Sequence, residues 1–289
     1  MKIKKSPARI AFEVFNTLFM LFIVLITVYP MYHVVVASFS EPYQLAAHSG
    51  FLLRPYGPYE WGAYRDIFNH PLLISGFTNT VIIVVGGTAL NILFTSLGAF
   101  FMSQKGPMLK GVVAVMIIIT MYFGGGLVPS YMLVKNLGLM DTRWAIILPG
   151  LIGVTNLIIL KTSFQTIPDS LTESALLDGA SYLQIMFRIM LPLSKATIAV
   201  LVLYYALGHW NAWFSASIYL RDRAKFPLQL AVKQLLESDS KFAGDFVASK
   251  HAQLMKYGII VVTSAPVIAI YPFLQKYFTK GVLMGSVKG

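Results

Sequence analysis

Long stretches without a charged side chain set the hydrophobic pattern of this chain. Each stretch approaches the ~20 residues that an α-helix needs to cross ~30 Å of hydrocarbon. A helix is expected there because it satisfies its backbone hydrogen bonds internally, where lipid offers no water. The pattern predicts an all-α membrane protein with six spanning helices, one in each charge-free stretch: 14–40, 67–104, 111–134, 144–160, 196–220 and 257–275.

The composition favours membrane insertion over a soluble fold. Hydrophobic residues make up 56% of the 289 residues and charged residues only 12%, against the ~25% charged residues usual in soluble domains. A soluble protein with six buried core helices is the alternative, and it fits the length of the apolar runs poorly. The first run is also too long for the apolar core of a removable signal peptide.

The net charge of +11 does not indicate a nucleic-acid partner, because the basic residues are spread over the loops. Anionic lipid headgroups explain them better. Basic residues precede the first helix and bracket the second connection, at Lys105 and Lys110. By the positive-inside rule they place both termini in the cytoplasm. The outside segment 221–256 is also basic, but long loops follow this rule poorly.

One predicted span contains an internal break. Three glycines, 124–126, and Pro129 interrupt the apolar stretch 111–134. We expect an irregular or re-entrant piece there, which a membrane tolerates where protein or water satisfies the backbone. The sequence contains no tandem repeat, so residues 1–289 are predicted to form a single transmembrane domain.

The inside connection at 165–192 carries dense local signals. Ser170 with Glu173, and Ser181 with Gln184, each match a capping box, in which two side chains satisfy free N–H groups at a helix start. Gly179 lies between them, where a positive φ would end the first helix. The connection is therefore predicted to form a short helix, a sharp turn and a new helix.

An apolar stripe on the short helix suggests that this connection has a partner. Leu171, Ala175 and Leu176 share one face. A compact knob that docks into a soluble partner explains the stripe and the tight capping. The alternative is an amphipathic helix that lies on the membrane surface.

The same connection resembles the signature of ABC importer permeases, E-A-A-x₃-G-x₉-I-x-L-P. The signature's second position, usually Ala, is Ser here, and seven positions match its spacing: Glu173, Ser174, Ala175, Gly179, Ile189, Leu191 and Pro192. The resemblance implies the type I (MetI-like) importer fold and a coupling helix that sits in a cleft of a cytoplasmic ATPase. The residues implied to transmit ATPase closure are Glu173, Ser174, Ala175, Leu176, Asp178, Gly179, Ala180 and Pro192.

Further resemblances narrow the family to carbohydrate importers of the maltose type, which are MalG-like. They include Asn79-Thr80-Val81, expected at the opening of the second helix, and Trp210-Asn211 in the fifth. The nearest resemblance is to the LplC or YtcP branch, which serves complex oligosaccharides in Gram-positive bacteria.

Two more segments contact partners in the resembled family. The outside loop, 221–256 here, probes the solute-binding protein; the alternative is a merely solvated loop. The C-terminal tail, 281–289 here, resembles one that reaches between the ATPase subunits. The tail residues implied to contact the ATPase are Gly285, Lys288 and Gly289.

No motif indicates an enzyme. The chain lacks the G-x-x-x-x-G-K-[ST] loop that cradles phosphates, so ATP and Mg²⁺ are expected on the partner ATPase and no cofactor on this chain. The five histidines form no helical i, i+4 pair and cysteine is absent, so no metal site and no catalytic residue is predicted.

A sugar pathway needs aromatic faces for pyranose rings and polar groups for hydroxyls. Polar side chains inside a membrane usually face a cavity or another helix. For any single candidate, packing between helices is the more frequent explanation. The candidate substrate-path residues are Asn79, Tyr131, Tyr205, Trp210, Asn211 and Trp213.

These observations predict a permease subunit of an ATP-driven carbohydrate importer, multi-pass in the bacterial cell membrane. The resemblance implies a second, different permease, two copies of the ATPase and an extracellular solute-binding lipoprotein. An importer of the same class for a non-sugar solute is the first alternative. An ion-driven transporter is the second, but the buried mid-membrane charges and inverted repeat that it predicts are not evident.

Overall fold

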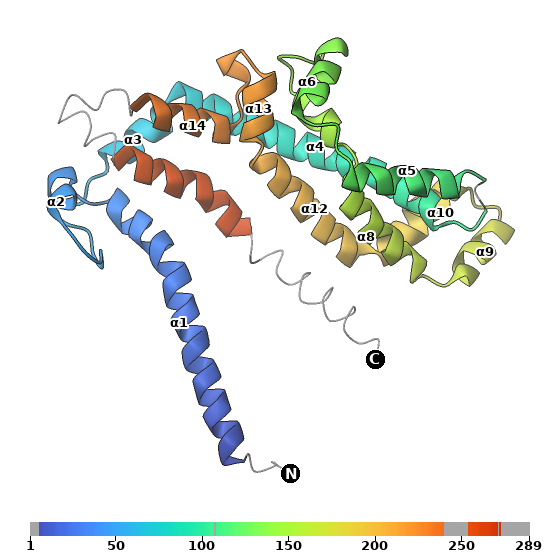
Figure 1. Cartoon of the computed structure of the whole chain (residues 1–289), viewed down its shortest axis with the longest axis horizontal. Coiled ribbons are helices and arrows are strands. Elements are labelled where there is room, and N and C mark those ends of the chain that lie inside the picture. The colour runs from blue at the N-terminus through green and yellow to red at the C-terminus, as the bar shows by residue number, and fades with distance from the viewer. Residues whose placement is uncertain (1–5, 107, 240–253, 271, 273–289) are drawn as a thin grey trace. The chain divides into compact units, whose positions relative to one another are not determined.

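The computed structural model of the protein describes residues 6–106, 108–239, 254–270 and 272. These residues form helices joined by turns and loops, and none of them lies in a strand (Figure 1). For the described residues, the all-α prediction is confirmed. The chain divides into two compact units, 1–70 with 235–265 and 71–234 with 266–289.

The first unit contains a long apolar helix, α1 (Pro7–Ser38). Val36 and Ala37, near its C-terminal end, are buried together with Leu52. The preceding turns expose their apolar side chains: Phe15 is 67% exposed and Leu25 is 69% exposed. An apolar helix of 32 residues without a packed face needs lipid or another protein around it, so α1 has the character of a membrane span.

Two short helices follow in this unit, α2 (Pro42–Ala47) and α3 (Gly62–Asn69). The hydroxyl of Tyr64 in α3 lies 2.6 Å from that of Ser38 at the end of α1. Most of the apolar helix Leu254–Ile270 also belongs to this unit.

The second unit is organised around α4 (Pro71–Ser103). Two other helices, α8 (Val154–Gln165) and α12 (Lys195–Trp210), pack along it (Figure 1). The remaining helices that begin in this unit are α5 (Lys110–Tyr122), α6 (Leu127–Asn136), α7 (Trp144–Ile147), η1 (Leu148–Gly150), α9 (Asp169–Leu177), α10 (Tyr182–Ile185), the π-helical turn η2 (Met186–Met190), α11 (Leu191–Leu193), α13 (Trp213–Tyr219), η3 (Arg223–Lys225) and α14 (Leu228–Asp239).

Small and polar residues allow α12 to approach α4 closely. A ring nitrogen of His209, Nε2, lies 2.6 Å from Oδ1 of Asn91. Gly87 lies against the same ring, and a Cβ at this glycine would come within 2.5 Å of Nε2. Small residues and interhelical hydrogen bonds are the usual means of helix association in a membrane.

The spans are less regular than the sequence predicted. Both α1 and α4 are long and apolar enough to cross a membrane unaided. Three further candidates are pairs of helices that meet at a bend. If each pair is one span, the described residues supply up to five, beside the shorter apolar helix Leu254–Ile270. The bent pairs are Lys110–Tyr122 with Leu127–Asn136 (120°), Trp144–Gly150 with Val154–Gln165 (51°), and Tyr182–Leu193 with Lys195–Trp210 (88°).

Two local predictions about the spans had opposite outcomes. The predicted break is confirmed, because α5 and α6 are separated by the glycines and Gly126 has a φ of 85°, which residues with a Cβ rarely adopt. The prediction that Asn79 opens the second helix was wrong. That helix, α4, begins at Pro71, since proline is well suited to the first turn, where no N–H is needed.

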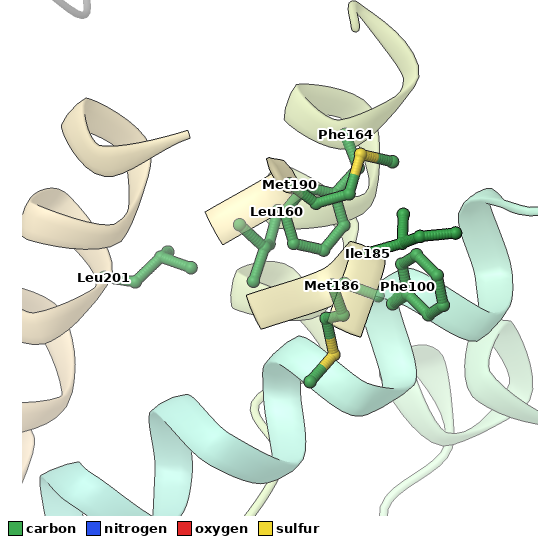
Figure 2. Packing of buried hydrophobic residues seen from close by; sticks show 8 residues of the cluster. Phe100, Leu160, Phe164, Ile185, Met186, Met190 and Leu201 are labelled. Carbon is green, nitrogen blue, oxygen red and sulfur yellow. The ribbon is translucent and has the colours of Figure 1, made fainter. Parts of the chain in front are cut away.

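A cluster of buried apolar side chains surrounds one end of α4 (Figure 2). It combines residues from α4, α8, α10, η2 and α12: Ala99, Phe100, Leu160, Phe164, Ile185, Met186, Met190 and Leu201. Close packing gains many small dispersion contacts that a void would forfeit. The connection at 165–192 is therefore anchored to the helix bundle at this end of α4.

Candidate functional site

We use the name knob for residues 165–192. Its first helix, α9, ends in a Schellman motif: the N–H of Gly179 donates to the carbonyl of Leu176 at 3.0 Å, and the N–H of Ala180 donates to that of Ala175 at 2.9 Å. Gly179 has a φ of 82°, as the sequence predicted. A Cβ added there would meet nothing within 4 Å, so the glycine is required for its backbone conformation and not for space.

One of the two predicted capping boxes forms. The hydroxyl of Ser181 accepts the N–H of Gln184 at 3.3 Å, and the side chain of Gln184 accepts the N–H of Ser181 at 2.8 Å. The box predicted at Ser170 and Glu173 was wrong. Pro168 takes the extended N-cap conformation, so Ser170 already lies within the first turn of α9, and no side chain caps this helix.

The knob has an inner and an outer face. Ala175 and Ala180 are partly buried and pack against the apolar cluster of Figure 2. Glu173, Ser174 and Asp178 are exposed. Of the predicted coupling residues, the two alanines therefore fix the knob to the bundle, and the exposed ones are available to a partner. The remaining three, Leu176, Gly179 and Pro192, are also exposed.

The sequence analysis missed the most exposed apolar residue of the knob. Leu177 is 89% exposed, compared with 43% for Leu171 and 39% for Leu176 of the predicted stripe. It lies in the last turn of α9, next to the Schellman motif. An exposed leucine beside a rigid turn is the kind of side chain that a partner's groove can bury.

The connection between α4 and α5 contacts the knob. Lys105 donates a hydrogen bond to Asp169 in an ion pair whose side chains are 84% and 63% exposed. The hydrogen bond that Lys105 donates to Asp169 raises the pKa of Lys105 above its usual value. A cavity of about 360 Å³ lies between this connection and α9, and its lining includes Lys110 and Glu173. Sequence reasoning used these lysines for orientation and did not place them beside the knob.

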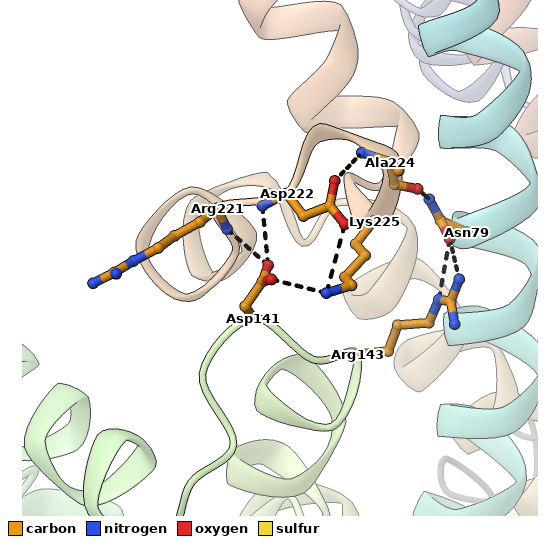
Figure 3. A network of polar contacts seen from close by, with 7 residues as sticks. All are labelled: Asn79, Asp141, Arg143, Arg221, Asp222, Ala224 and Lys225. Carbon is orange, nitrogen blue, oxygen red and sulfur yellow. Dashed lines mark hydrogen bonds and ion pairs between the residues drawn. The ribbon is translucent and has the colours of Figure 1, made fainter.

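A second set of polar contacts lies at the opposite end of α4 (Figure 3). We name it the polar bridge and define it by the residues drawn there: Asn79, Asp141, Arg143, Arg221, Asp222, Ala224 and Lys225. From Asn79 to Phe100 in the knob's anchor, a helical rise of 1.5 Å per residue corresponds to roughly 30 Å, about the thickness of a bilayer's hydrocarbon core.

Asp141 is the centre of one half of the polar bridge. Its Oδ1 accepts the N–H groups of Arg221 and Asp222, each at 3.0 Å, and its Oδ2 accepts Lys225 Nζ at 2.8 Å. The hydrogen bond from Lys225, followed by those two N–H groups, holds the pKa of Asp141 well below its usual range. Asp141 also has a φ of 58°, which aspartate tolerates better than most residues.

Asn79 is the centre of the other half. Its Nδ2 donates to the carbonyls of Ala224 at 2.7 Å and Phe226 at 3.1 Å, and its Oδ1 accepts two N–H groups of Arg143 at 3.0 and 2.7 Å. The side chain is 3% exposed and fully engaged. Its place on the bridge explains why a polar residue lies two turns inside α4.

A cavity of about 470 Å³, which we name the bridge cavity, opens beside these contacts. Three positions of α4 form part of its wall: Ile82, Gly86 and Leu90. The rest is lined by Asp141, Thr142, Arg143, Trp144, Ile147 and Lys225. Sequence reasoning singled out none of these residues.

The structure brings two of the predicted substrate-path residues to one cavity. Tyr205 and Asn211 both line a cavity of about 400 Å³ beside α12. The hydroxyl of Tyr205 is also bound between Thr95, at 2.6 Å, and the N–H of Gly153, at 2.9 Å. This tyrosine therefore ties three helical segments together, whatever else it contacts.

The other aromatic candidates have neighbours of their own. Tyr131 stacks on Tyr219, with ring centroids 6.4 Å apart. Trp210 packs edge-on against a phenylalanine of α4 at the same centroid distance. Lys233 Nζ lies 4.2 Å from the ring centroid of Trp213, a cation–π contact. Together with Asn79, these residues are dispersed over the unit, and their role in a sugar path stays a prediction.

Some predicted sites lie outside the described residues, including the tail positions Gly285, Lys288 and Gly289 and much of the outside loop 221–256. In the part of the chain that the structure describes, no group of three His, Cys, Asp or Glu side chains is arranged to hold a metal ion.

Comparison with known proteins links these features to a family. A family model described as "Binding-protein-dependent transport system inner membrane component" matches residues 107–284. The polygalacturonan/rhamnogalacturonan transport system permease protein YtcP of Bacillus subtilis (strain 168) is 40% identical over 276 residues, covering 94% of this chain and 96% of the relative. Protein LplC of the same organism is 39% identical over 282 residues, covering 96% and 95%.

A solved structure is similar over the whole length. It is the crystal structure of a bacterial ABC transporter involved in the import of the acidic polysaccharide alginate, with a TM-score of 0.88, 28% identity, and coverage of 96% of this chain and 100% of that one. The predicted resemblance to ABC importer permeases, the MetI-like fold and the likeness to LplC and YtcP are confirmed. The chain belongs to the family of binding-protein-dependent transport system inner membrane components.

Proposed function

We propose that this chain is a permease subunit that imports oligosaccharides, with ATP hydrolysed by a separate partner. The observation that carries the proposal is similarity over nearly the full length to a permease whose name specifies polygalacturonan and rhamnogalacturonan. Because the sequence carries no phosphate-binding loop, we expect ATP and Mg²⁺ to bind to the partner ATPase.

The geometry of the knob supports a mechanical role in this process. Its shape is fixed by the Schellman motif at Gly179 and the capping box at Ser181, and its base is packed into the bundle through Ala175 and Ala180. A rigid part of this kind transmits a displacement instead of absorbing it. Closure of the ATPases would push on the exposed face of the knob and turn the helices that it anchors, which opens the path on the other side.

The proposed assembly contains this chain, a second and different permease, two ATPase copies and an extracellular solute-binding lipoprotein. The exposed apolar surface of α1 is consistent with a place in lipid or against another membrane subunit. We propose six spans in all, from α1, α4, the three bent pairs and the helix that begins at Leu254. Both termini and the knob would face the cytoplasm, and the polar bridge would face outward.

Uptake by the complete importer, reconstituted with its binding protein in vesicles, tests the function. We expect ATP-dependent uptake of labelled oligosaccharide that disappears when this chain is omitted. Uptake of an amino acid in place of any sugar would support the non-sugar alternative. Uptake driven by an ion gradient without ATP would support an ion-driven transporter and contradict the proposal.

The orientation has a direct test because the chain contains no cysteine. Leu177→Cys in the knob and Arg221→Cys at the bridge each introduce a single thiol. A membrane-impermeant maleimide added to intact cells should label the second variant and not the first. Permeabilised cells should show labelling of both, and the reverse pattern in intact cells would overturn the proposed topology.

A further inference from the structure

We propose that the bridge cavity is a charge-selective subsite, in which Arg143 binds the carboxylate of an acidic sugar residue at the outer entrance of the transport path. This inference rests on the proposed function and adds to it the charge of the substrate and the residue that reads it. The class of ligand is an oligosaccharide that contains uronate residues.

The charged side chains around the cavity are not evenly compensated. Its lining includes two cations, Arg143 and Lys225, and one carboxylate, Asp141. Asp141 is already bound by Lys225 and two backbone N–H groups. Lys225 also lies 3.6 Å from Asp222, so its charge is compensated twice. Within the described part of the chain, no carboxylate pairs with Arg143, whose exposed charge remains for a ligand.

The guanidinium of Arg143 is held in one orientation by Asn79. A guanidinium has five N–H donors, and the amide oxygen of Asn79 accepts from its Nε and one terminal nitrogen. This contact fixes the plane of the group and leaves further N–H donors for a ligand. Asn79 is itself held by the carbonyls of Ala224 and Phe226. A guanidinium that is positioned in advance loses little freedom when it binds a planar carboxylate in a bidentate manner.

The remaining wall of the cavity includes an aromatic ring and an open position. Trp144, next to Arg143 in the chain, is 51% exposed and lines the cavity. An aromatic ring offers a surface on which a pyranose can stack. The wall at Gly86 faces open space, because a Cβ at this glycine would meet nothing within 4 Å. The volume of about 470 Å³ falls within the ~300–1,000 Å³ usual for small-molecule sites.

A neutral sugar cannot form an ion pair with Arg143, whereas a uronate or an anionic lipid headgroup can. The cavity's combination of an aromatic wall and one forked cation fits a carboxylate on a sugar ring. One relative, YtcP, is named for polygalacturonan and rhamnogalacturonan transport, and the similar solved structure is of a transporter involved in the import of an acidic polysaccharide. We therefore commit to the uronate and leave the lipid headgroup as an outcome of the test.

The experiment measures uptake of trigalacturonate and of its methyl ester by the complete importer in vesicles. For Arg143→Gln, the KM for trigalacturonate should rise about tenfold, the loss expected when one charge-assisted contact is removed, while the KM for the neutral ester should change less than about twofold. Arg143→Lys keeps the charge but loses the forked geometry, so its KM for the acid should lie between those of the wild type and Arg143→Gln. Arg221→Gln is the matched control: it removes a nearby positive charge whose side chain points away from Asn79 and Arg143 (Figure 3) and does not line the cavity.

Several results would overturn the inference. An unchanged KM in Arg143→Gln, or an equal change for acid and ester, would show that Arg143 does not read charge. A KM for the acid in Arg143→Lys as high as in Arg143→Gln would show that a positive charge at this position does not contribute to binding. An effect that disappears in vesicles without anionic lipid would assign the cavity to a headgroup. Wild-type uptake of the ester alone would overturn only this inference, whereas uptake of neither sugar would also overturn the proposed function.

Discussion

The knob and the polar bridge lie at opposite ends of α4 and are built in different ways. In the knob, the hydrogen bonds that set the shape join residues three to five positions apart, such as Ser181 with Gln184 and Ala180 with Ala175. In the bridge, most of them join residues that are remote in sequence. Arg143 and Asn79 are 64 positions apart, and Asn79 and Phe226 are 147.

This difference separates two mechanical roles. Local hydrogen bonds can persist while the bundle moves, so the knob can act as one piece on whatever pushes it. The bridge depends on how α4 and two loops are placed, so any rotation of the helices must strain or exchange its contacts. We therefore expect changes in the knob to affect coupling, and changes in the bridge to affect the stability or selectivity of the opposite face.

The largest effect is expected at Gly179. The change Gly179→Val places a β-branched residue at a φ of 82°, which costs about 1–2 kcal/mol in the left-handed region, and the strain would reshape the end of α9. Uptake by the reconstituted importer should fall by about tenfold while ATP hydrolysis continues. Gly179→Asn, which tolerates this conformation, is the control and should retain uptake. Full uptake by Gly179→Val at normal expression would contradict the coupling role.

The middle of α4 offers a test of whether the two ends share a rigid connection. In Gly87→Ala, the new methyl group would meet His209 at 2.5 Å, and overpacking of this kind costs about 1–3 kcal/mol. Gly86→Ala is the matched control, because its methyl group enters open space. Thermal unfolding of the purified protein should show a lower Tm for the first variant alone. Equal Tm values would mean that α12 can shift away from α4 without cost.

The helix cap in the knob should have a smaller effect. Ser181→Ala removes one partner of the capping box and should cost about 1 kcal/mol in the free energy of unfolding. Ser170→Ala is the control, because Ser170 caps nothing in α9. Hydrogen exchange at residues 182–185 should speed up in the first variant and stay unchanged in the second. A similar effect of both changes would indicate that Ser170 also caps a helix, contrary to the structure.

The smallest effect concerns pH and the bridge. Hydrogen bonds from Lys225 and from the N–H groups of Asp222 and Arg221 lower the pKa of Asp141 in the folded protein. Stabilisation by a lowered carboxyl pKa is present above the unfolded value of about 3.9 and is lost as pH falls toward the folded value. The Tm difference between wild type and Asp141→Asn should therefore be constant from about pH 8 to pH 5 and shrink only below about pH 4.

A difference that changed between neutral and mildly acidic pH would mean that another titrating group controls the bridge. Lys225→Met, measured in the same way, is a useful companion, since it removes the first of the donors that lower the pKa of Asp141. Its effect should be larger than that of Arg221→Met, because Arg221 contacts Asp141 through its backbone and not its side chain.

In the knob, short motifs led to two correct predictions and one wrong one. Gly179 and the Ser181 box were predictable because each is set by residues within one or two helical turns. The prediction at Ser170 was wrong because the capping-box motif does not fix the residue at which the helix begins. Pro168 decided that, by taking the N-cap conformation two residues earlier.

The sequence by itself determined the all-helical, membrane-inserted character of this protein, the break near Gly126 and the shape of the knob. These features depend on hydrophobic runs and backbone preferences that neighbouring residues carry. The tertiary structure alone decided the pairing of Asp141 with Lys225, the hold of Asn79 on Arg143, and the cavity beside them. A polar side chain has many possible partners along a chain, and only the packing of α4 with α7 and η3 selects which of them come within hydrogen-bonding distance.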